Sequence, residues 1–529
     1  MKKLFRICLF LLPIAARGVV CQMPDSSFLD MADFTGAKAF YERGIYGQNV
    51  NVANLELNVP DTDSDIYTIF LKDVNYSTYW PKETSERVGI HQNQTLSVMA
   101  GYNPSFDNQE VSTGLAHEAN YTAAQVGEST ILLSQDKIII SSYETFFSNG
   151  TDVISSSWKD SSQKGYMAGA ILDSFARKSP STVFVAAASN DGLDGVGNVS
   201  SPYKNMNVIS VGALDESTYF KTIAPSSSYG PNDFYNPVSG EITKSVVSAV
   251  DIAAPGTVYT VKADETFGNQ SGTSFAAPIV SSVATLMISY SKSQGMSADS
   301  RDARLIKAIL LNSASKPQSW DNGSKKVDSV SVNGVSYDGV FSTSEALDFH
   351  SGAGILNAEQ ALAEYDNFDK TSFIGEVGKG NSAFYYFDAT GGGATLSATL
   401  CWFVGSSVES VEYDGDGMIS SINAQDSYFA NLDLRLWLSN SDGESELVAQ
   451  SVSDYNNVEH LFLNLEDSGR YALEVYFDDM VYGDVQTETF ALAWNLAQVP
   501  EPAQVSIWLS LLAASFAIFV RARNRSDKV

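Results

Sequence analysis

The chain has 529 residues, of which 44% are hydrophobic and 18% are charged, so it has the size and composition of a folded protein with a large core. Its formal net charge of −29 excludes a nucleic-acid binder, because the phosphate backbone is bound mainly through lysine and arginine. Its three cysteines, Cys8, Cys21 and Cys401, are too few for a disulfide framework, so the hydrophobic core has to hold the fold.

Residues 1–21 have the pattern of a secretory signal peptide. Basic residues near the start are followed by an apolar segment from Ile7 to Ala16 and by small residues that suit cleavage. Cys21 would suit a lipoprotein, but the bulky Val20 before it disfavours lipid attachment. We therefore expect an exported protein, and we expect the short segment before the first predicted helix to leave no room for an ordinary inhibitory propeptide.

The stretch from Gln270 to Val280 places a serine at the expected start of a helix. Gly272 allows a close approach, Thr273 and Ser274 are residue types that cap helices, and an almost entirely apolar segment follows. Pro278 falls in the first turn, where backbone N–H groups have no intrahelical partners. A helix that is apolar nearly all round is a buried one. The residues alone fit either a capped core helix or a serine hydroxyl placed to stabilise a developing anion.

The segment Gly-Thr-Ser-x-Ala-x-Pro at residues 272–278 resembles the nucleophile motif of the subtilisin-like serine proteases, the subtilases. The resemblance extends over about residues 35–365. It implies that Ser274 attacks a peptide carbonyl and that an acid, a histidine and an oxyanion-binding asparagine lie upstream. It also implies a parallel sheet with helices on both faces, and the alternation of expected strands and helices predicts the same α/β fold.

The acid is expected at the end of the first strand. A short helix over Thr35–Gly44 and a glycine turn precede the strand Asn49–Leu55, which ends in Glu56. In subtilases this layout places the acid of the triad at the strand end. Glu56 stands where the family usually has aspartate, and Leu57-Asn58 replaces a small residue and a glycine. The resemblance assigns the acid to Glu56, and the next candidates are Asp61, Asp63 and Asp65.

Two of the four histidines are candidates for the general base. His91 begins a predicted helix that closes at Gly101, although it lacks the Gly-Thr that usually follows the histidine in subtilases. His117 lies in a Gly-x-Ala-x-x-Ala segment that resembles the turn after the histidine helix. The position of His91 between the acid and the nucleophile favours it over His117.

The oxyanion hole and the substrate contacts are expected at the ends of two further strands. A buried strand from Ser181 ends in Asn190, which the resemblance assigns to the oxyanion hole; an asparagine at a strand end is otherwise usually a turn residue. The strand within residues 151–158 resembles the one whose edge pairs with an extended substrate. The residues expected to contact substrate are Ser157, Trp158 and Ser189.

The pattern changes after Thr371 to short alternating strands separated by Gly, Asp, Ser and Asn, which predicts an antiparallel β-sandwich. This part resembles the jelly-roll modules that follow many bacterial subtilases. We expect a peptidase domain over 22–368 and a sandwich over 369–497. Glu412, Asp414 and Asp416 have alternating spacing, but no glutamate closes the loop, so a solvated acidic loop is favoured over a calcium site. The chemistry needs no cofactor, structural calcium remains an alternative, and no metal ligands are assigned.

The C-terminal residues 498–529 have the pattern of a sorting tail. A Val-Pro-Glu-Pro linker precedes the apolar segment Ala503–Val520 and the basic segment Arg521–Arg525, which together predict a transmembrane helix with its positive end in the cytoplasm. The tail resembles the PEP-CTERM signal of Gram-negative bacteria. This resemblance implies an exosortase-type sorting enzyme as a partner, transient membrane anchoring, and delivery to the cell envelope or the exterior. A simple membrane anchor is the alternative.

These features predict an exported serine endopeptidase that forms an acyl-enzyme through Glu56, His91 and Ser274, with Asn190 in the oxyanion hole and a protein or peptide as substrate. The alternative is an inactive subtilase fold that serves as a binding or structural module at the cell surface. Three departures from the family pattern favour that alternative: Glu56, the residues after His91, and Trp158-Lys159, where the family often has leucine and glycine.

Overall fold

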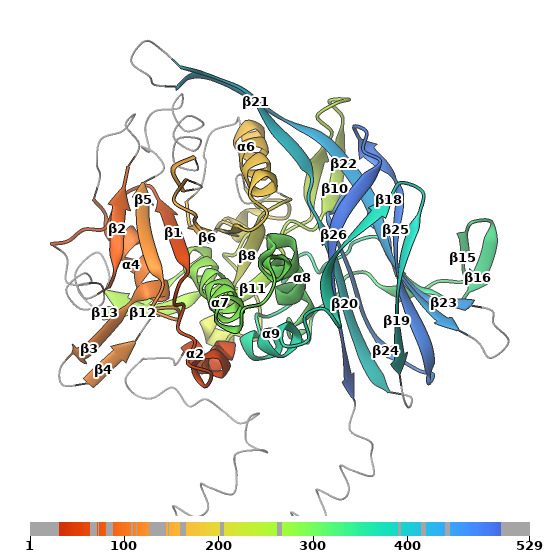
Figure 1. Ribbon diagram of the computed structural model, residues 1–529, viewed down its shortest axis with the longest axis horizontal. Helices are drawn as coiled ribbons and strands as arrows, with labels where there is room; N and C mark the ends of the chain where they lie inside the picture. Colours follow the sequence, from red (N-terminus) through yellow and green to blue (C-terminus); the bar gives the residue numbers. More distant parts are fainter. Residues whose placement is uncertain are drawn as a thin grey trace, which may run out of the picture.

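The computed structural model describes residues 31–63, 71, 74–80, 88–106, 109–112, 114–125, 144–146, 148–158, 165–200, 206–261, 267–389, 393–413, 419–439 and 445–498. The predicted signal peptide and nearly all of the sorting tail lie outside these residues, as do Asp65, Lys159, Asp414 and Asp416. The described chain has an α/β part and a β-sandwich, which lie side by side (Figure 1).

The α/β part is built on a seven-stranded parallel sheet. Its strand order is β11-β8-β7-β6-β1-β5-β2, and each neighbouring pair runs parallel. The central strands are almost completely buried, as is typical of parallel sheets covered on both faces. The strands are β1 (Asn51–Glu56), β2 (Tyr76–Tyr79), β5 (Asn120–Gln125), β6 (Val153–Ser156), β7 (Val183–Ala187), β8 (Ile209–Leu214) and β11 (Ile252–Pro255).

Helices cover both faces of this sheet, which confirms the predicted fold class. Alternate residues of a strand point to opposite faces, and one core cluster joins Val52 of β1 to the helices α4, α7 and α8. A second cluster joins Ala53 of the same strand to α6. The helices are α2 (Met31–Thr35), α3 (Lys38–Tyr41), α4 (Ile90–Ala100), α6 (Gly165–Lys178), α7 (Thr273–Gln294), α8 (Ala303–Asn312) and α9 (Ala358–Tyr365).

Helix α7 is the central helix of the α/β part. It packs against β6, β7, β8 and β11. It begins at Thr273, so Pro278 lies inside the helix and not in its first turn, where the sequence pattern placed it. Within the described residues, it is the helix whose length and hydropathy would suit a membrane span. However, 94% of its most apolar 18-residue segment is buried in the protein. Its apolar character therefore reflects its place in the core.

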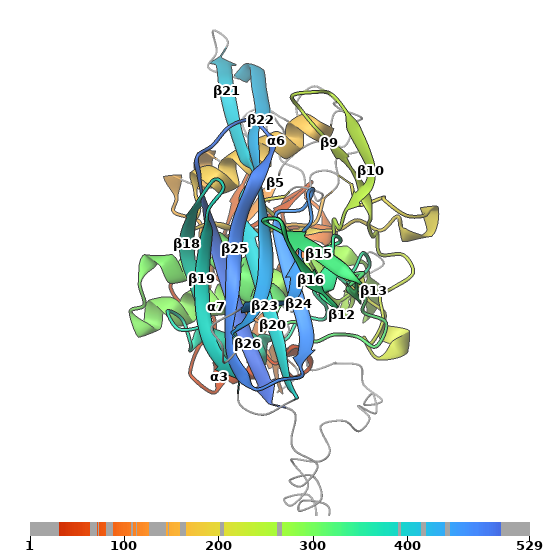
Figure 2. The ribbon, with the colours of Figure 1, turned by 90° about the vertical axis from the view of Figure 1, so that its right-hand side faces the viewer.

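The C-terminal part is a two-layered antiparallel β-sandwich, as predicted. The inner sheet has the order β18-β26-β20-β24, and the outer sheet has the order β14-β17-β23-β22-β25-β19, with β21 paired to β22. Figure 2 looks onto the outer sheet. The strands that follow residue 369 are β18 (Ser372–Gly378), β19 (Ser382–Ala389), β20 (Ala394–Trp402), β21 (Gly405–Tyr413), β22 (Ile419–Ser439), β23 (Ser445–Ser451), β24 (Val458–Leu465), β25 (Gly469–Tyr482) and β26 (Thr487–Gln498).

Two strands of the outer sheet come from before the predicted boundary at residue 368. Strand β14 (Lys325–Lys326) pairs with β17 (Phe341–Thr343), and β17 pairs in parallel with β23. The remaining strands form hairpins: β3 (Tyr102–Phe106) with β4 (Gln109–Ser112), β9 (Asn232–Tyr235) with β10 (Ile242–Val247), β12 (Thr257–Val261) with β13 (Phe267–Ser271), and β15 (Ser329–Val332) with β16 (Val335–Asp338).

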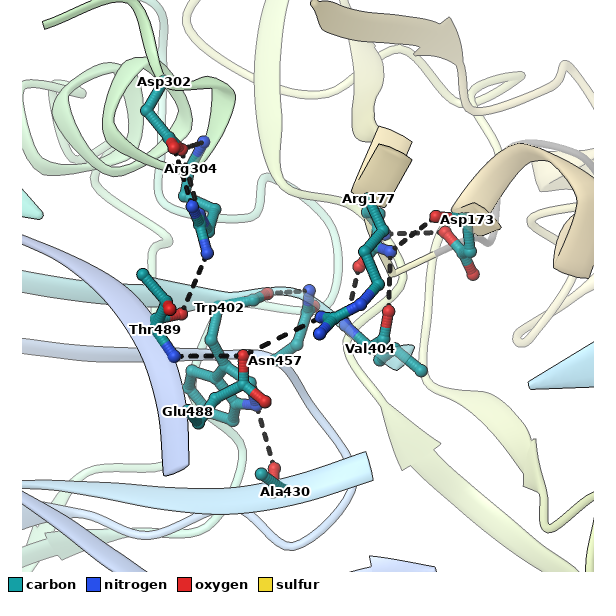
Figure 3. Close-up of polar contacts among 11 residues, drawn as sticks. Asp173, Arg177, Asp302, Arg304, Trp402, Val404, Ala430, Asn457, Glu488 and Thr489 are labelled. Atoms are coloured by element: carbon teal, nitrogen blue, oxygen red, sulfur yellow. Dashed lines mark hydrogen bonds and ion pairs between the residues drawn. The ribbon is translucent and has the colours of Figure 1, made fainter. Parts of the chain in front are cut away.

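One hydrophobic cluster spans the two parts, and a further cluster joins the two sheets of the sandwich. Helix α8 packs against β20 and β26 of the inner sheet, and the core cluster around α7 includes Cys401 and Ala491 from the sandwich. Polar contacts cross the same interface. Arg304 donates to the carbonyl oxygen of Thr489 at 3.2 Å (Figure 3). Asn207 donates to the carbonyl oxygen of Val404 at 2.9 Å. The sandwich is therefore an integral layer of the described structure.

Candidate active site

Glu56 and His91 meet at the carboxyl end of the parallel sheet. Glu56 is the last residue of β1, between the neighbouring strands β5 and β6, and only 2% of it is exposed. His91 is the second residue of α4. The imidazole Nδ1 lies 3.0 Å from Oε2 of Glu56, which is hydrogen-bond distance. The structure thus brings together two residues that are far apart in the sequence.

The buried carboxylate sets the electrostatics of His91. The negative charge of Glu56 raises the pKa of the imidazole above its ordinary value of 6.5; burial of the ring opposes this effect, and the hydrogen bond to Glu56 reinforces it. A carboxylate can only accept a hydrogen bond, so Nδ1 carries the proton. In the neutral ring, Nε2 is then left as the basic nitrogen.

Ser274 is the second residue of α7, and the residue after it faces His91. The ring of the next residue, Phe275, has its centroid 6.3 Å from that of His91. The backbone carbonyl of Ser274 accepts a hydrogen bond from the Ser157 hydroxyl at 3.0 Å, which ties the start of α7 to the end of β6. Among the described contacts the Ser274 hydroxyl and His91 are not hydrogen-bonded to each other. Such bonds often form fully only when a substrate is bound.

Asn190 is oriented by the first residue of α7. Its Oδ1 accepts from the backbone N–H of Thr273 at 2.9 Å and from the Thr273 hydroxyl at 3.1 Å. Because a backbone N–H can only donate, the amide oxygen must face Thr273 and the amide nitrogen must point away from it. Asn190 is exposed. Its Nδ2 is thus a fixed donor beside the helix that carries Ser274.

Gly272 permits this close approach. Its φ of +153° is a conformation that residues with a side chain rarely adopt. A Cβ atom added at Gly272 would lie 3.3 Å from both amide atoms of Asn190, which is tighter than ordinary van der Waals contact. The absence of a side chain at Gly272 thus leaves room for the amide group of Asn190.

The three residues expected to contact substrate follow the ends of β6 and β7, and their side chains are buried. Trp158 is 3% exposed and packs in the core cluster that includes α6. The Ser189 hydroxyl donates to Asp191 at 2.7 Å, and its backbone has a positive φ of +84°, which is uncommon for a residue other than glycine. Ser157 holds the Ser274 carbonyl.

The alternative candidates for the triad have other contacts. His117 stacks on Tyr102 with their ring centroids 4.7 Å apart. The Asp61 side chain accepts from the backbone N–H of Asp63 at 3.0 Å. It is the Glu56 carboxylate that bonds His91.

Sequence reasoning did not identify Thr273 as the residue that orients Asn190, although it lies inside the nucleophile motif. The sequence indicated this role only through the polar side chain of Thr273 beside Ser274. In the described ranges, no group of three or more His, Cys, Asp or Glu side chains is placed to hold a metal ion. Of the acidic residues considered for calcium, only Glu412 is described.

The fold and site define a class of protein: an α/β chain with a serine at the start of a buried helix, a histidine–carboxylate pair beside it, and an oriented asparagine amide. Residues 54–354, more than half of the chain, match the model of the subtilase family, Peptidase_S8. The chain therefore belongs to the subtilase family, as the motifs predicted.

Individual relatives are more distant. The chain is 28% identical over 257 residues to subtilisin NAT of Bacillus subtilis subsp. natto, which covers 48% of this chain and 59% of that protein. It is 27% identical over 253 residues to subtilisin DY of Bacillus licheniformis, which covers 47% of this chain and 79% of that protein. The chain thus matches less than two thirds of the length of subtilisin NAT.

Similar solved structures include the prenylagaramide maturation protease PagA, with a TM-score of 0.43 and 19% identity over 62% of this chain and 98% of that chain. The PatG macrocyclase in complex with peptide has a TM-score of 0.42 and 15% identity over 63% of this chain and 97% of that chain.

Proposed function

We propose that this protein is a serine endopeptidase that hydrolyses protein or peptide substrates through Ser274, His91 and Glu56. The observation that carries the proposal is the 3.0 Å contact between His91 and the buried Glu56 beside the start of α7. Membership of the subtilase family and the relatives named as subtilisins support the same activity.

In the proposed mechanism, the Ser274 hydroxyl attacks the scissile carbonyl carbon while Nε2 of His91 takes its proton. Glu56 holds the Nδ1–H group and stabilises the imidazolium that forms. Nδ2 of Asn190 and the backbone N–H of Ser274 donate to the oxyanion of the tetrahedral intermediate. His91 then gives its proton to the leaving amine, and an acyl-enzyme remains. Water, activated by the same histidine, releases the second product.

The substrate would be bound as an extended chain. The ends of β6 and β7 carry Ser157, Trp158 and Ser189 next to Ser274 and Asn190. Because these side chains face inward, we propose that their main-chain groups pair with the substrate in the manner of an added strand.

The choice of histidine gives a direct test of this function. We expect His91→Ala to abolish peptide hydrolysis, because Nε2 is the proton acceptor, and we expect His117→Ala to keep most of it. Hydrolysis of a fluorogenic peptide and of casein, with circular dichroism to verify folding, measures both variants. Loss of activity in folded His117→Ala alone would contradict the assignment. Absence of hydrolysis by the parent protein would favour the alternative of a surface binding or structural module.

We also propose that the protein is exported and sorted through its C-terminal tail. The apolar segment Ala503–Val520 is long enough to span a membrane, and Arg521–Arg525 would hold its end in the cytoplasm. An exosortase-type enzyme would then release the chain near the Pro-Glu-Pro segment at residues 500–502. Mass spectrometry of the protein recovered from the cell surface should find no residue beyond this segment. Recovery of peptides that contain Arg525 would leave a simple anchor instead.

A further inference from the structure

A buried hydrogen-bond network joins the strand that carries Glu56 to the helix that carries His91. Nε2 of Gln92 donates to the backbone carbonyl of Asn54 at 3.0 Å, and Nδ2 of Asn54 donates to the Thr95 hydroxyl at 3.0 Å. All three side chains are completely buried. Asn54 stands two residues before the acid, and Gln92 follows the histidine directly, so the network fixes β1 against α4 next to the pair.

A second contact fixes the start of the same helix. Gly89 is the N-cap of α4, and a Cβ atom built there would lie 2.4 Å from Nδ2 of Asn58. The backbone of Gly89 is extended, with φ of −168°, so its conformation does not require glycine. The missing side chain instead makes room for Asn58. The backbone N–H of Gly89 also donates to the carbonyl of Val59 at 2.9 Å.

These contacts coincide with the positions at which the sequence departs from the pattern of the family. Glutamate has one methylene more than the usual aspartate, so its carboxylate reaches further from β1. Asn58 stands in place of a glycine, and Gln92 follows the histidine in place of another. All of these positions lie where β1 and the loop after it meet α4.

We propose that Gln92 and Asn58 are positioning residues that set the spacing between β1 and α4 so that a glutamate can meet the histidine. This inference rests on the proposed role of Glu56 as the acid of the triad. Neither side chain touches the reacting atoms. A displacement of about 1 Å in a catalytic group can lower the rate by about 10²-fold, so a small shift of α4 would be costly.

The pKa of His91 reports the distance between its ring and the Glu56 carboxylate, and therefore the spacing between β1 and α4. The charged group that bonds the ring is Glu56, from β1. Helix α7 presents Phe275 to the ring, and the neighbours of His91 in α4, Ile90 and Gln92, are uncharged. Asp61 also lies against α4, where its backbone bonds the side chain of Asn93. Loss of the close contact with Glu56 would therefore lower the pKa of His91.

The test is an NMR titration of the histidine ring protons in the full chain, together with kcat and KM for peptide hydrolysis. The chain has only four histidines, and His91→Ala assigns the signal. Gly89→Ala and Gln92→Met should each lower the pKa of His91 toward 6.5 and lower kcat by about 10²-fold, with little change in KM. Asn58→Gly should lower both values as well, because it removes the side chain for which Gly89 makes room at the start of α4.

Thr285→Ala is the matched control. It removes a buried hydrogen bond of 2.8 Å within α7 and does not touch the contact between β1 and α4, so the pKa of His91 should not change. If Gly89→Ala does not fold, Gln92→Met and Asn58→Gly still decide the question.

The positioning proposal is wrong if the pKa of His91 is unchanged in folded Gln92→Met and in folded Asn58→Gly. A parent protein that hydrolyses no peptide but shows the expected pKa pattern would contradict the proposed function and leave the positioning role intact. The two failures are therefore distinguishable.

Discussion

At the residue scale, the site depends on one carboxylate with a single described partner. Oε2 of Glu56 bonds His91, whereas Oε1 is buried and none of the described groups hydrogen-bonds it. A buried carboxylate oxygen without a partner is unfavourable, so the contact with His91 is the main interaction that compensates its burial. We infer that the orientation of the carboxylate and that of the imidazole depend on each other.

Substitution of Glu56 tests this dependence. Glu56→Gln keeps the shape of the side chain but loses the charge, and by analogy with an aspartate-to-asparagine change in a serine protease we expect kcat to fall by about 10⁴-fold. Glu56→Asp should also lose activity, because the shorter side chain leaves the imidazole unheld. Kinetics on a fluorogenic peptide measure both. If Glu56→Gln is as fast as the parent, Glu56 is not the acid, and Asp61, Asp63 or Asp65 is the next candidate.

Glu56→Gln should also change the pH dependence of kcat/KM. His91 must be neutral to accept the Ser274 proton, and its pKa is raised by Glu56, so kcat/KM of the parent should fall as the pH falls through a value above 6.5. The residual activity of Glu56→Gln should fall at a lower pH than that of the parent, because the negative charge is gone. An unchanged acid limb would mean that Glu56 does not control the ionisation of His91.

The motifs of the sequence indicated which residues to examine but not how their side chains are directed. Ser274 and Asn190 stand in strong local motifs, and the turn before a helix brings Thr273 and Asn190 together. Trp158 shows the limit of this reasoning. It follows a strand at the expected place, but its burial depends on packing against α6, which no local pattern of residues contains.

At the element scale, the parallel strands and α7 were predictable because their hydrophobic patterns are continuous. The apolar segment that follows Ser274 predicted a buried helix, and α7 is buried over almost its whole length. The start of α4 was predicted at His91 and lies at Ile90. The sequence did not predict that the polar residues from Gln92 to Gln94 are buried. Those amides are buried because Gln92 bonds β1 and Asn93 bonds the loop at Asp61, which are tertiary contacts.

The sandwich shows the same distinction between local and long-range information. Alternating strands after Thr371 predicted an antiparallel sandwich, and the structure contains one. Strands β17 and β23 pair although they are about a hundred residues apart in the sequence. The residues of one strand do not indicate that it pairs with the other. Strand existence is a local property, whereas strand order is not.

At the scale of the whole molecule, the sandwich completes the core of the α/β part. Polar side chains, buried or half-buried, bond across the interface: Asn312 accepts from the Ser397 hydroxyl at 2.9 Å, and Asn495 donates to Glu364. Burial raises the pKa of Glu364 to about 7, in spite of the hydrogen bonds that Asn312 and Asn495 donate to it. Without the sandwich, the apolar surface of α8 and these polar groups would be exposed together.

A truncation tests the shared core. We expect a chain that ends at residue 368 to be insoluble or to lack a cooperative thermal transition, because α8 loses the packing of β20 and β26. The full chain under the same conditions is the control, and differential scanning calorimetry measures the transition. A truncated chain that melts cooperatively and hydrolyses peptides would show that the α/β part folds independently.

The central claim is that Ser274 is an activated nucleophile, and covalent labelling tests it most directly. We expect a fluorophosphonate probe to label the parent protein at Ser274, as located by mass spectrometry of the labelled peptide. Labelling should be lost in Ser274→Ala and strongly slowed in His91→Ala. Absence of labelling in the folded parent, or equal labelling of Ser274→Ala, would contradict the account.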